Sequence, residues 1–282
     1  MEENLKSIYW EGNWRKEGDV SFGLNRAFRF GDGLFESILA IHDKLPLIDL
    51  HLNRLKEGMK VLLLNDENSF LNGVQHLIEN KLAELGYRNS IVRIWVFRDG
   101  GGKYTPTTNT AAFCVQIEER NNSSAYLNKK GLTIDICKTV NLSYSTTSKY
   151  KTISSLPYIL ASIEKEQSPY DDLILLNQNN LVAEATSSNL FLIKNNQIFT
   201  PPLSSGCVEG VGRTHFINME SIGLAVEEKE ISLKDIIDAD ELFLLNAVTG
   251  PKWVAAFQQK RYFHQKIAGI YGASPTTARW WS

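Results

Sequence analysis

The sequence predicts a mixed α/β (α+β) fold. Apolar residues alternate with a period of two in segments such as 90–98, which predicts strands, and recur at helical spacing in segments such as 70–85. The chain has 282 residues, more than one typical domain, so two domains or one large domain are both reasonable. Since 43% of the residues are hydrophobic, a sizeable core is available.

Charge and cysteine usage exclude several classes of protein. The chain has 30 Lys and Arg against 32 Asp and Glu, which offers no electrostatic argument for binding nucleic acid or an anionic membrane. Cys114, Cys137 and Cys207 lie far apart without CxxC spacing, which fits a reducing compartment and gives no metal site. The sequence starts without an apolar signal segment, and no later run is long enough to span a bilayer. We therefore expect a soluble cytoplasmic protein.

Residues 1–120 are predicted to form an N-terminal α/β domain. Gly31, Asp32 and Gly33 indicate a tight turn, for which a plain hairpin is the simplest interpretation. The polar residues 121–130 are predicted to link this domain to a C-terminal domain, residues 131–282. The expected strands of the N-terminal domain are 8–10, 34–39, 44–48, 90–98 and 111–117, and its expected helices are 51–63 and 70–85.

The predicted helix 51–63 carries one notable cation. Asp49 is the expected N-cap, and the expected buried stripe consists of Leu52, Leu55, Met59 and Leu62. Arg54 lies on the margin of this stripe, where an arginine usually extends to solvent. Its planar guanidinium is also suited to holding a phosphate group.

A glycine-rich loop, residues 99–106, follows the strand 90–98. It is bracketed by Arg98 and Lys103, and no helix follows it, so it is not the glycine motif of a dinucleotide fold. A loop with two cations could grip a substrate carboxylate, and an exposed flexible hairpin is an equally supported interpretation.

The second half of the chain alternates strands with short helices. Pro157 is acceptable in the first turn of the helix 156–167. The tail, residues 274–282, has no predicted structure. The expected strands are 132–138, 172–176, 181–185, 190–194, 197–200 and 241–245, and the expected helices are 156–167, 210–222 and 231–238.

Lys151 and Glu184 are the residues most in need of explanation. Lys151 lies in a loop rich in Ser and Thr, and a lysine amine becomes a nucleophile when its surroundings lower its pKa. Considered alone, it is more simply a solvated loop lysine. Glu184 is a lone carboxylate in an apolar strand that leads into a hydroxyl-rich turn. The two segments together indicate a bound cofactor.

Two further segments have features of a binding site. Gly206, Gly210 and Gly212 precede or begin a predicted helix, where exposed backbone N–H groups and the helix dipole favour an anion. A loop that uses glycine for steric reasons is an equally supported interpretation. Residues 246–251 form a polar turn at the end of a strand, a place where sites often lie.

Four segments resemble, in the same order, the class IV aminotransferase family, whose members are pyridoxal-phosphate enzymes of fold type IV. The segments are 30–36, 51–55, the lysine loop at 148–154, and 184–191. The resemblance extends over residues 26–254 and implies a two-domain enzyme that binds pyridoxal 5'-phosphate and a small amino substrate. It also implies a homodimer with both active sites near the subunit interface.

The resemblance implies a role for individual residues. Lys151 would be catalytic, forming the Schiff base with the cofactor and then acting as the base at Cα. Glu184 would keep the pyridine nitrogen protonated, and Arg54 would bind the phosphate. Several members have threonine where Gly212 stands, so only its backbone amide is expected to contact the phosphate. The predicted cofactor-binding residues are Arg54, Lys151, Glu184, Ser188, Val211, Gly212 and Asn246, and the predicted substrate-binding residues are Phe35, Arg98 and Ala247.

Within the family, two segments favour one reaction. Residues 97–104 and the pair Asn246-Ala247 resemble the aminodeoxychorismate lyases, which remove pyruvate from aminodeoxychorismate and leave 4-aminobenzoate for folate synthesis. A D-amino acid or branched-chain-type aminotransferase is the alternative, although Ser37 stands where the branched-chain enzymes usually have glycine. A non-catalytic module that binds a small phosphate compound is a third alternative, and it would not need Lys151 and Glu184 together.

Overall fold

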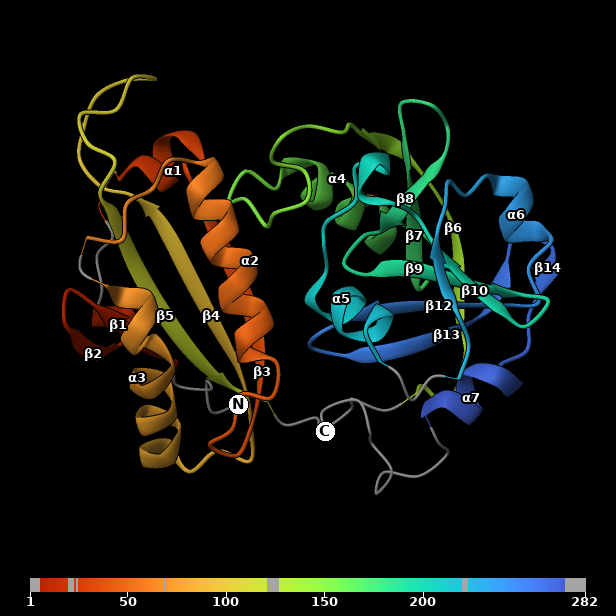
Figure 1. The fold of residues 1–282 in the computed structure, drawn as a ribbon, viewed down its shortest axis with the longest axis horizontal. Coiled ribbons are helices and arrows are strands. Elements are labelled where there is room, and N and C mark those ends of the chain that lie inside the picture. Colours follow the sequence, from red (N-terminus) through yellow and green to blue (C-terminus); the bar gives the residue numbers. More distant parts are fainter. Residues whose placement is uncertain are drawn as a thin grey trace. The chain divides into compact units, whose positions relative to one another are not determined.

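The computed structural model describes two compact units, which are treated one at a time (Figure 1). The described residues are 6–19, 23, 25–67, 69–120, 127–219 and 223–271. The first unit is Met1–Ser123 with Tyr150–Ser154, and the second is Ser124–Lys149 with Ser155–Ser282. The segment around Lys151 therefore packs with the first unit, although it follows the predicted linker. Part of that linker, 121–126, and the tail 274–282 lie outside the described residues.

The first unit is built on an antiparallel sheet, with five strands among the described residues in the order β2-β1-β5-β4-β3. The strands are β1 Ser7–Trp10, β2 Asn13–Lys16, β3 Gly33–Ile41, β4 Asn89–Arg98 and β5 Ala111–Glu119. Its helices are the 3-10 turn η1 Glu17–Asp19, α1 Arg26–Phe30, α2 Ile48–Val61 and α3 Phe70–Leu85. Strand β3 lies at the edge of this sheet, which leaves one side of it open to further pairing.

Helices α2 and α3 cover one face of the sheet and form the core with it (Figure 1). Val74, Ile78 and Leu82 of α3 are buried at helical spacing, as the sequence predicts. On α2, the predicted residues Leu55 and Met59 are buried, and His51 joins them on the same face. A buried histidine within an apolar stripe indicates that α2 has a role besides packing.

Three local predictions for the first unit are wrong. Gly31 ends the short helix α1 with a φ of 66°, so the glycine pair forms a helix-to-strand turn and not a hairpin. Residues 44–48 form only a bridge between Ile41 and Lys44, because helix α2 already begins at Ile48. Asp49 lies inside the first turn of α2, and Leu47 occupies the N-cap position.

The second unit contains a mixed sheet, with nine strands within the residues that the structure describes. The strand order is β11-β10-β9-β12-β13-β6-β7-β8, with β14 paired to β13. The strands are β6 Leu132–Leu142, β7 Asp172–Asn177, β8 Val182–Ala185, β9 Asn189–Lys194, β10 Gln197–Thr200, β11 Val226–Glu228, β12 Glu241–Asn246, β13 Gly250–Phe257 and β14 Lys260–Arg261. Strands β7, β8 and β9 are almost entirely buried, which explains their near-continuous apolar sequences.

The helices of the second unit are short and pack against this sheet (Figure 1). They are α4 Leu156–Glu166, the 3-10 turn η2 Leu203–Ser205, α5 Val211–Ile217, α6 Leu233–Ile237 and α7 Gln265–Tyr271. Helix α5 ends at Ile217, with Asn218 as its C-cap, and is shorter than the predicted helix 210–222. In the described part of the chain, no helix is both long enough and apolar enough to cross a membrane.

Candidate functional site

The segment that carries Lys151 extends the first unit's sheet at its edge. The backbone N–H of Phe35 donates to the carbonyl of Lys151 at 2.8 Å, and the N–H of Ile153 donates to the carbonyl of Gly33 at 2.9 Å. Leu34 and Thr152 form the antiparallel bridge between these two bonds. Lys151 therefore has a backbone position fixed by β3, although it lies in a segment without helix or strand of its own.

Glycines allow this close approach. A Cβ at Gly33 would lie 2.7 Å from the Cδ1 of Ile153, and a Cβ at Gly31 would lie 3.0 Å from the Cβ of Ser154. On α2, a Cβ at Gly58 would come within 3.3 Å of Tyr150. The Phe-Gly-Asp-Gly segment is thus explained by the packing of the lysine segment, because any larger residue would push that segment away.

The side chain of Lys151 lies against Phe35. Its Nζ is 4.4 Å from the centroid of the Phe35 ring, within the range of a cation–π contact. The structure thus brings together the predicted catalytic residue and a predicted substrate-binding residue. Lys151 as a whole residue is half-buried, so it is neither a fully solvated loop lysine nor a core residue.

Arg54 takes part in a buried ion pair. Its Nε donates to Oε1 of Glu36 at 2.8 Å, and its Nη2 donates to Oε2 of the same carboxylate at 2.5 Å. The Nδ1 of His51 lies 2.6 Å from Oε2 of Glu36. The Arg54 side chain is 8% exposed and that of Glu36 is 2% exposed, so Arg54 does not extend to solvent.

The charge states of this group follow from its contacts. Burial alone would raise the pKa of the Glu36 carboxyl, but the charge of Arg54 and the hydrogen bond from His51 help to lower that pKa to about 2. Burial lowers the pKa of His51, and its hydrogen bond to Glu36 does not fully offset this effect. At neutral pH, Glu36 is an anion and His51 is neutral. A carboxylate can only accept, so the proton of the neutral imidazole is on Nδ1.

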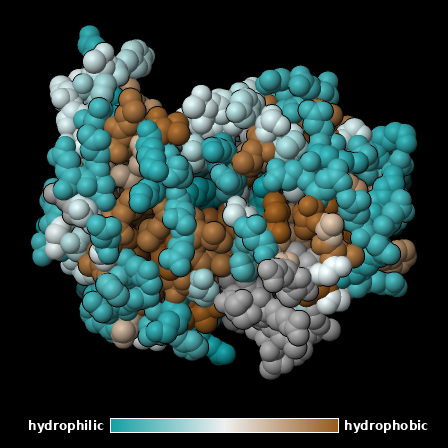
Figure 2. Space-filling view, viewed as in Figure 1, coloured by the Kyte–Doolittle hydropathy of each residue, from teal (hydrophilic) through white to brown (hydrophobic). Residues whose placement is uncertain are grey.

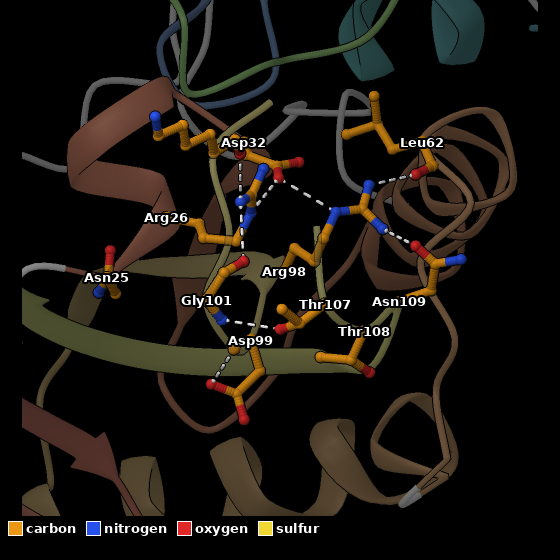
Figure 3. Close-up of polar contacts among 12 residues, drawn as sticks. Asn25, Arg26, Asp32, Leu62, Arg98, Asp99, Gly101, Thr107, Thr108 and Asn109 are labelled. Atoms are coloured by element: carbon orange, nitrogen blue, oxygen red, sulfur yellow. Dashed lines mark hydrogen bonds and ion pairs between the residues drawn. The ribbon is translucent and has the colours of Figure 1, made fainter. Parts of the chain in front are cut away.

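Arg98, which the sequence predicts to bind substrate, is buried among protein acceptors (Figure 3). Its Nε donates to Oδ2 of Asp32 at 3.0 Å, and its Nη1 donates to Oδ1 of Asn109 at 2.5 Å. Its Nη2 donates to the carbonyl of Leu62 at 2.6 Å, and Nη1 also reaches that of Leu63 at 3.3 Å. These bonds join β4 to the end of α2, and they favour a structural role over substrate binding.

The same carboxylate of Asp32 holds the glycine-rich loop. Arg26 donates from Nε to Oδ2 of Asp32 at 2.8 Å, and from Nη1 to the carbonyls of Gly101 and Lys103 at 3.1 and 2.8 Å. Figure 3 shows the side chains of Arg26 and Arg98 converging on Asp32. Arg26 therefore holds the loop through two backbone carbonyls, while Lys103 as a residue is exposed. The sequence indicates Asp32 only as a turn residue and does not predict this cluster.

In the second unit, Glu184 is a buried carboxylate that accepts hydrogen bonds from Tyr158, Val208 and Asn189. The hydroxyl of Tyr158 donates to Oε1 at 2.6 Å, the N–H of Val208 donates to Oε1 at 3.1 Å, and Nδ2 of Asn189 donates to Oε2 at 3.2 Å. Burial, and then the charge of Glu184, raise the pKa of Tyr158 well above its usual value. The hydroxyl of Tyr158 therefore stays protonated and stabilises the charged form of Glu184.

The hydroxyl-rich turn after Glu184 is fixed by a buried acid. Both the N–H and the hydroxyl of Thr186 donate to Oδ1 of Asp172, at 3.2 and 2.5 Å. Asp172 begins β7, the strand that pairs with the strand of Glu184. The turn that contains the predicted residue Ser188 is thus anchored directly to the sheet.

The other predicted residues of the second unit lie around Asn246. Its Nδ2 donates to Oγ of Ser188 at 3.1 Å, and its Oδ1 accepts from the N–H groups of Val248 and Thr249 at 3.0 and 2.8 Å. A Cβ at Gly212 would lie 3.0 Å from the backbone N of Ala247. The structure therefore brings Ser188, Asn246, Ala247 and Gly212 together, and Val211 begins α5 beside them.

The side chains of each unit fit pyridoxal 5'-phosphate. The first unit offers an amine at a fixed backbone position, Lys151, and a buried guanidinium, Arg54. The second unit offers a buried anion, Glu184, suited to a protonated ring nitrogen. A Cβ at Gly212 would make a tight contact, 3.0 Å, with the backbone of Asn246 and Ala247, and glycine can offer a phosphate only its backbone amide.

Comparison with known proteins shows relatives along most of the chain. The model of the family Amino-transferase class IV matches residues 33–255. A probable branched-chain-amino-acid aminotransferase of Thermotoga maritima is 33% identical over 266 residues, which cover 92% of this chain and 90% of that protein. An aminodeoxychorismate lyase of Vibrio harveyi is 26% identical over 231 residues, which cover 80% of this chain and 83% of that protein.

A solved structure shares the fold. An aminotransferase of Brucella abortus, bound to the cofactor PLP, is similar with a TM-score of 0.79 and 20% sequence identity, over 98% of this chain and 96% of that one. This similarity confirms the predicted mixed α/β fold. The relatives include both aminotransferases and a lyase, and sequence identities of 26% and 33% to this chain do not decide between the two reactions.

Proposed function

Because the chain belongs to the class IV aminotransferase family, we propose that it eliminates pyruvate from 4-amino-4-deoxychorismate and releases 4-aminobenzoate. The chain is an enzyme of this family, and its cofactor is pyridoxal 5'-phosphate. The observation that carries the proposal is the lysine at the sheet edge, because Lys151 keeps a fixed backbone position while its amine lies against Phe35.

The proposed roles follow from the contacts of each side chain. Bound pyridoxal phosphate supplies a ring that withdraws electrons from the substrate Cα. Glu184, held as an anion, keeps a proton on the ring nitrogen. Lys151 would take up the proton from Cα and give it to the departing three-carbon group, which leaves as pyruvate, and Arg54 and the amide of Gly212 would hold the phosphate. Ser188, Val211 and Asn246 complete the proposed cofactor contacts.

Elimination is supported by sequence features at two places. Residues 97–104 and the pair Asn246-Ala247 resemble the lyase branch, and the aminodeoxychorismate lyase of Vibrio harveyi is a relative over most of the chain. We assign substrate contact to Phe35 and Ala247, and the bonds of Arg98 to Asp32 make it a support for the loop instead. Transamination is the second candidate, since the Thermotoga maritima relative is a probable branched-chain aminotransferase.

One assay separates the candidates. Purified protein with pyridoxal phosphate is given aminodeoxychorismate alone, or D-alanine or L-leucine with 2-oxoglutarate. We expect 4-aminobenzoate and pyruvate in equal amounts from aminodeoxychorismate without a keto acid. Glutamate formation from D-alanine or L-leucine, with no 4-aminobenzoate, would show that the protein is a transaminase and not a lyase.

We also propose that the enzyme is a homodimer in the cytoplasm. Leu156, Ile159, Leu160 and Ile163 form an apolar stripe on α4, and their exposed fractions are 66%, 48%, 47% and 48%. The surface over α6 and β14 is mostly hydrophilic (Figure 2), so this stripe is unusual for its unit. An exposed apolar stripe favours an interaction surface, here for a second copy of the chain. Three free, buried cysteines support a reducing compartment.

A charged residue introduced into the α4 stripe is expected to dissociate the proposed dimer. Ile159→Glu would place a carboxylate in an apolar interface, so the variant should elute and scatter light as a monomer at concentrations where the natural chain is a dimer. Ile237→Glu on α6 is the matched control, because Ile237 is 47% exposed and lies outside the stripe. A dimer that tolerates Ile159→Glu would place the interface elsewhere.

A further inference from the structure

We propose that Glu36, supported by His51, is a positioning residue that aims Arg54 at the cofactor phosphate. This inference rests on the proposed function, because it concerns how the same site holds pyridoxal phosphate. Neither Glu36 nor His51 is among the residues that the family resemblance assigns to the cofactor. The sequence predicts only that Glu36 lies in a strand and His51 in a helix.

The first step is the geometry of the guanidinium. Glu36 receives Nε and Nη2 of Arg54, so both donors on one edge of the planar fork are directed at a single carboxylate. A bidentate contact of this kind fixes the plane and the rotation of the guanidinium, whereas a single contact would leave both free. The guanidinium of Arg54 is therefore held in one plane and at one rotation.

The second step is how the carboxylate is itself held. Glu36 lies on β3 between Leu34 and Ile38, on the face that packs against α2. The Nδ1–H of His51 donates to Oε2, the same oxygen that Nη2 of Arg54 contacts. His51 and Arg54 are three residues apart on α2, so adjacent side chains of one helix hold the carboxylate from two sides. The arrangement is therefore rigid.

The third step is that a structural role alone explains this cluster poorly. An apolar side chain between Leu34 and Ile38 would pack in the same core without the cost of burying a charge, and replacing a buried ion pair in this way often stabilises a protein. The Nε2 atom of His51 is also buried and has no hydrogen-bond partner among the described residues. A buried nitrogen without a partner is costly, so packing alone does not account for a histidine at position 51.

The fourth step is charge. Glu36 balances the charge of Arg54, and His51 is neutral, so the three side chains carry no net charge before the phosphate arrives. These three side chains therefore add little attraction over a distance, and their contribution to binding depends on the direction of the guanidinium donors. This dependence on direction is why the loss of the Glu36 carboxylate should weaken phosphate binding, even though a negative charge is removed.

The test compares two ligands that differ by the phosphate. Apoprotein of the full chain is titrated with pyridoxal 5'-phosphate and with pyridoxal, and binding is followed by absorbance. For Glu36→Gln we expect the dissociation constant for pyridoxal 5'-phosphate to rise about 10-fold or more, and that for pyridoxal to change less than about 2-fold. Glu118→Gln is the matched control, because it removes a carboxylate that pairs with Arg93 at 2.6 Å elsewhere on the sheet.

Two more variants complete the design. Arg54→Gln should lose the preference for the phosphorylated ligand, and Glu36→Gln combined with Arg54→Gln should be no weaker than Arg54→Gln alone, because both changes remove one interaction. If Glu36→Gln does not fold, Glu36→Asp retains the charge but shortens the side chain. It should then show the same selective loss for pyridoxal 5'-phosphate.

The outcomes are separable. A Glu36 variant that binds both ligands as the natural chain does, or loses both by the same factor, overturns the positioning role. Additive losses in the double variant overturn it as well. A natural chain that binds neither ligand overturns the proposed function instead, whatever the variants show.

Discussion

Lys151→Ala is expected to abolish the visible absorption band of protein loaded with pyridoxal phosphate and to lower turnover by about 10³-fold or more. The variant removes the amine that lies against Phe35 but retains the backbone bonds to Gly33 and Phe35, which involve no side-chain atom of residue 151. The segment should therefore stay on the edge of β3. The loss would then report on the amine alone.

Lys149→Ala is the control for this experiment. Lys149 lies two residues away and its carbonyl accepts from the N–H of Glu209 at 2.9 Å, a bond that the substitution retains. We expect this variant to keep the band and most of the turnover. Borohydride should fix the cofactor to the natural chain and to Lys149→Ala, and mass spectrometry should place the adduct on Lys151. An adduct on Lys149 would move the catalytic role to that residue.

Periodicity in the sequence predicts most of the fold because it reflects burial. Helix α3 spans the predicted residues 70–85, since its apolar residues recur at helical spacing and Gly86 ends it in the left-handed region. The segment 44–48 shows the limit of this reasoning. The apolar residues there satisfy the pattern of a strand, but they lead directly into α2, whose N-cap is Leu47 and whose first residue is Ile48. A segment of five residues is too short for its pattern to distinguish a strand from the start of a helix.

The site was harder to predict because its key contacts join elements that are distant in sequence. Arg54 was recognised as a cation beside an apolar stripe, but its pairing with Glu36 depends on how α2 lies over β3. Arg98 has the sequence environment of a substrate contact, and its bond to Asp32, which the sequence does not predict, is the basis for proposing a structural role. A polar residue inside an apolar pattern, such as Glu36 or His51, was the available signal for this cluster.

Gly33→Ala is expected to lower both the stability of the protein and its ability to hold the cofactor. A Cβ at Gly33 would lie 2.5 Å from the carbonyl oxygen of Val96 and 2.7 Å from the Cδ1 of Ile153. The first of these atoms belongs to the backbone of β4, so β3 itself must shift at Gly33, and the lysine segment that is bonded to Gly33 and Phe35 should shift with it. Overpacking of this kind costs about 1–3 kcal/mol.

Gly73→Ala is the matched control, because Gly73 lies inside α3 and a Cβ there would meet nothing within 4 Å. That change should leave cofactor binding intact and raise stability by about 0.5–1 kcal/mol, since alanine favours the helix more than glycine does. Thermal unfolding and titration with pyridoxal phosphate measure both effects. If Gly33→Ala retained the stability and the cofactor affinity of the natural chain, then contact with β3 could not be what positions Lys151, because an added methyl group must disturb that contact.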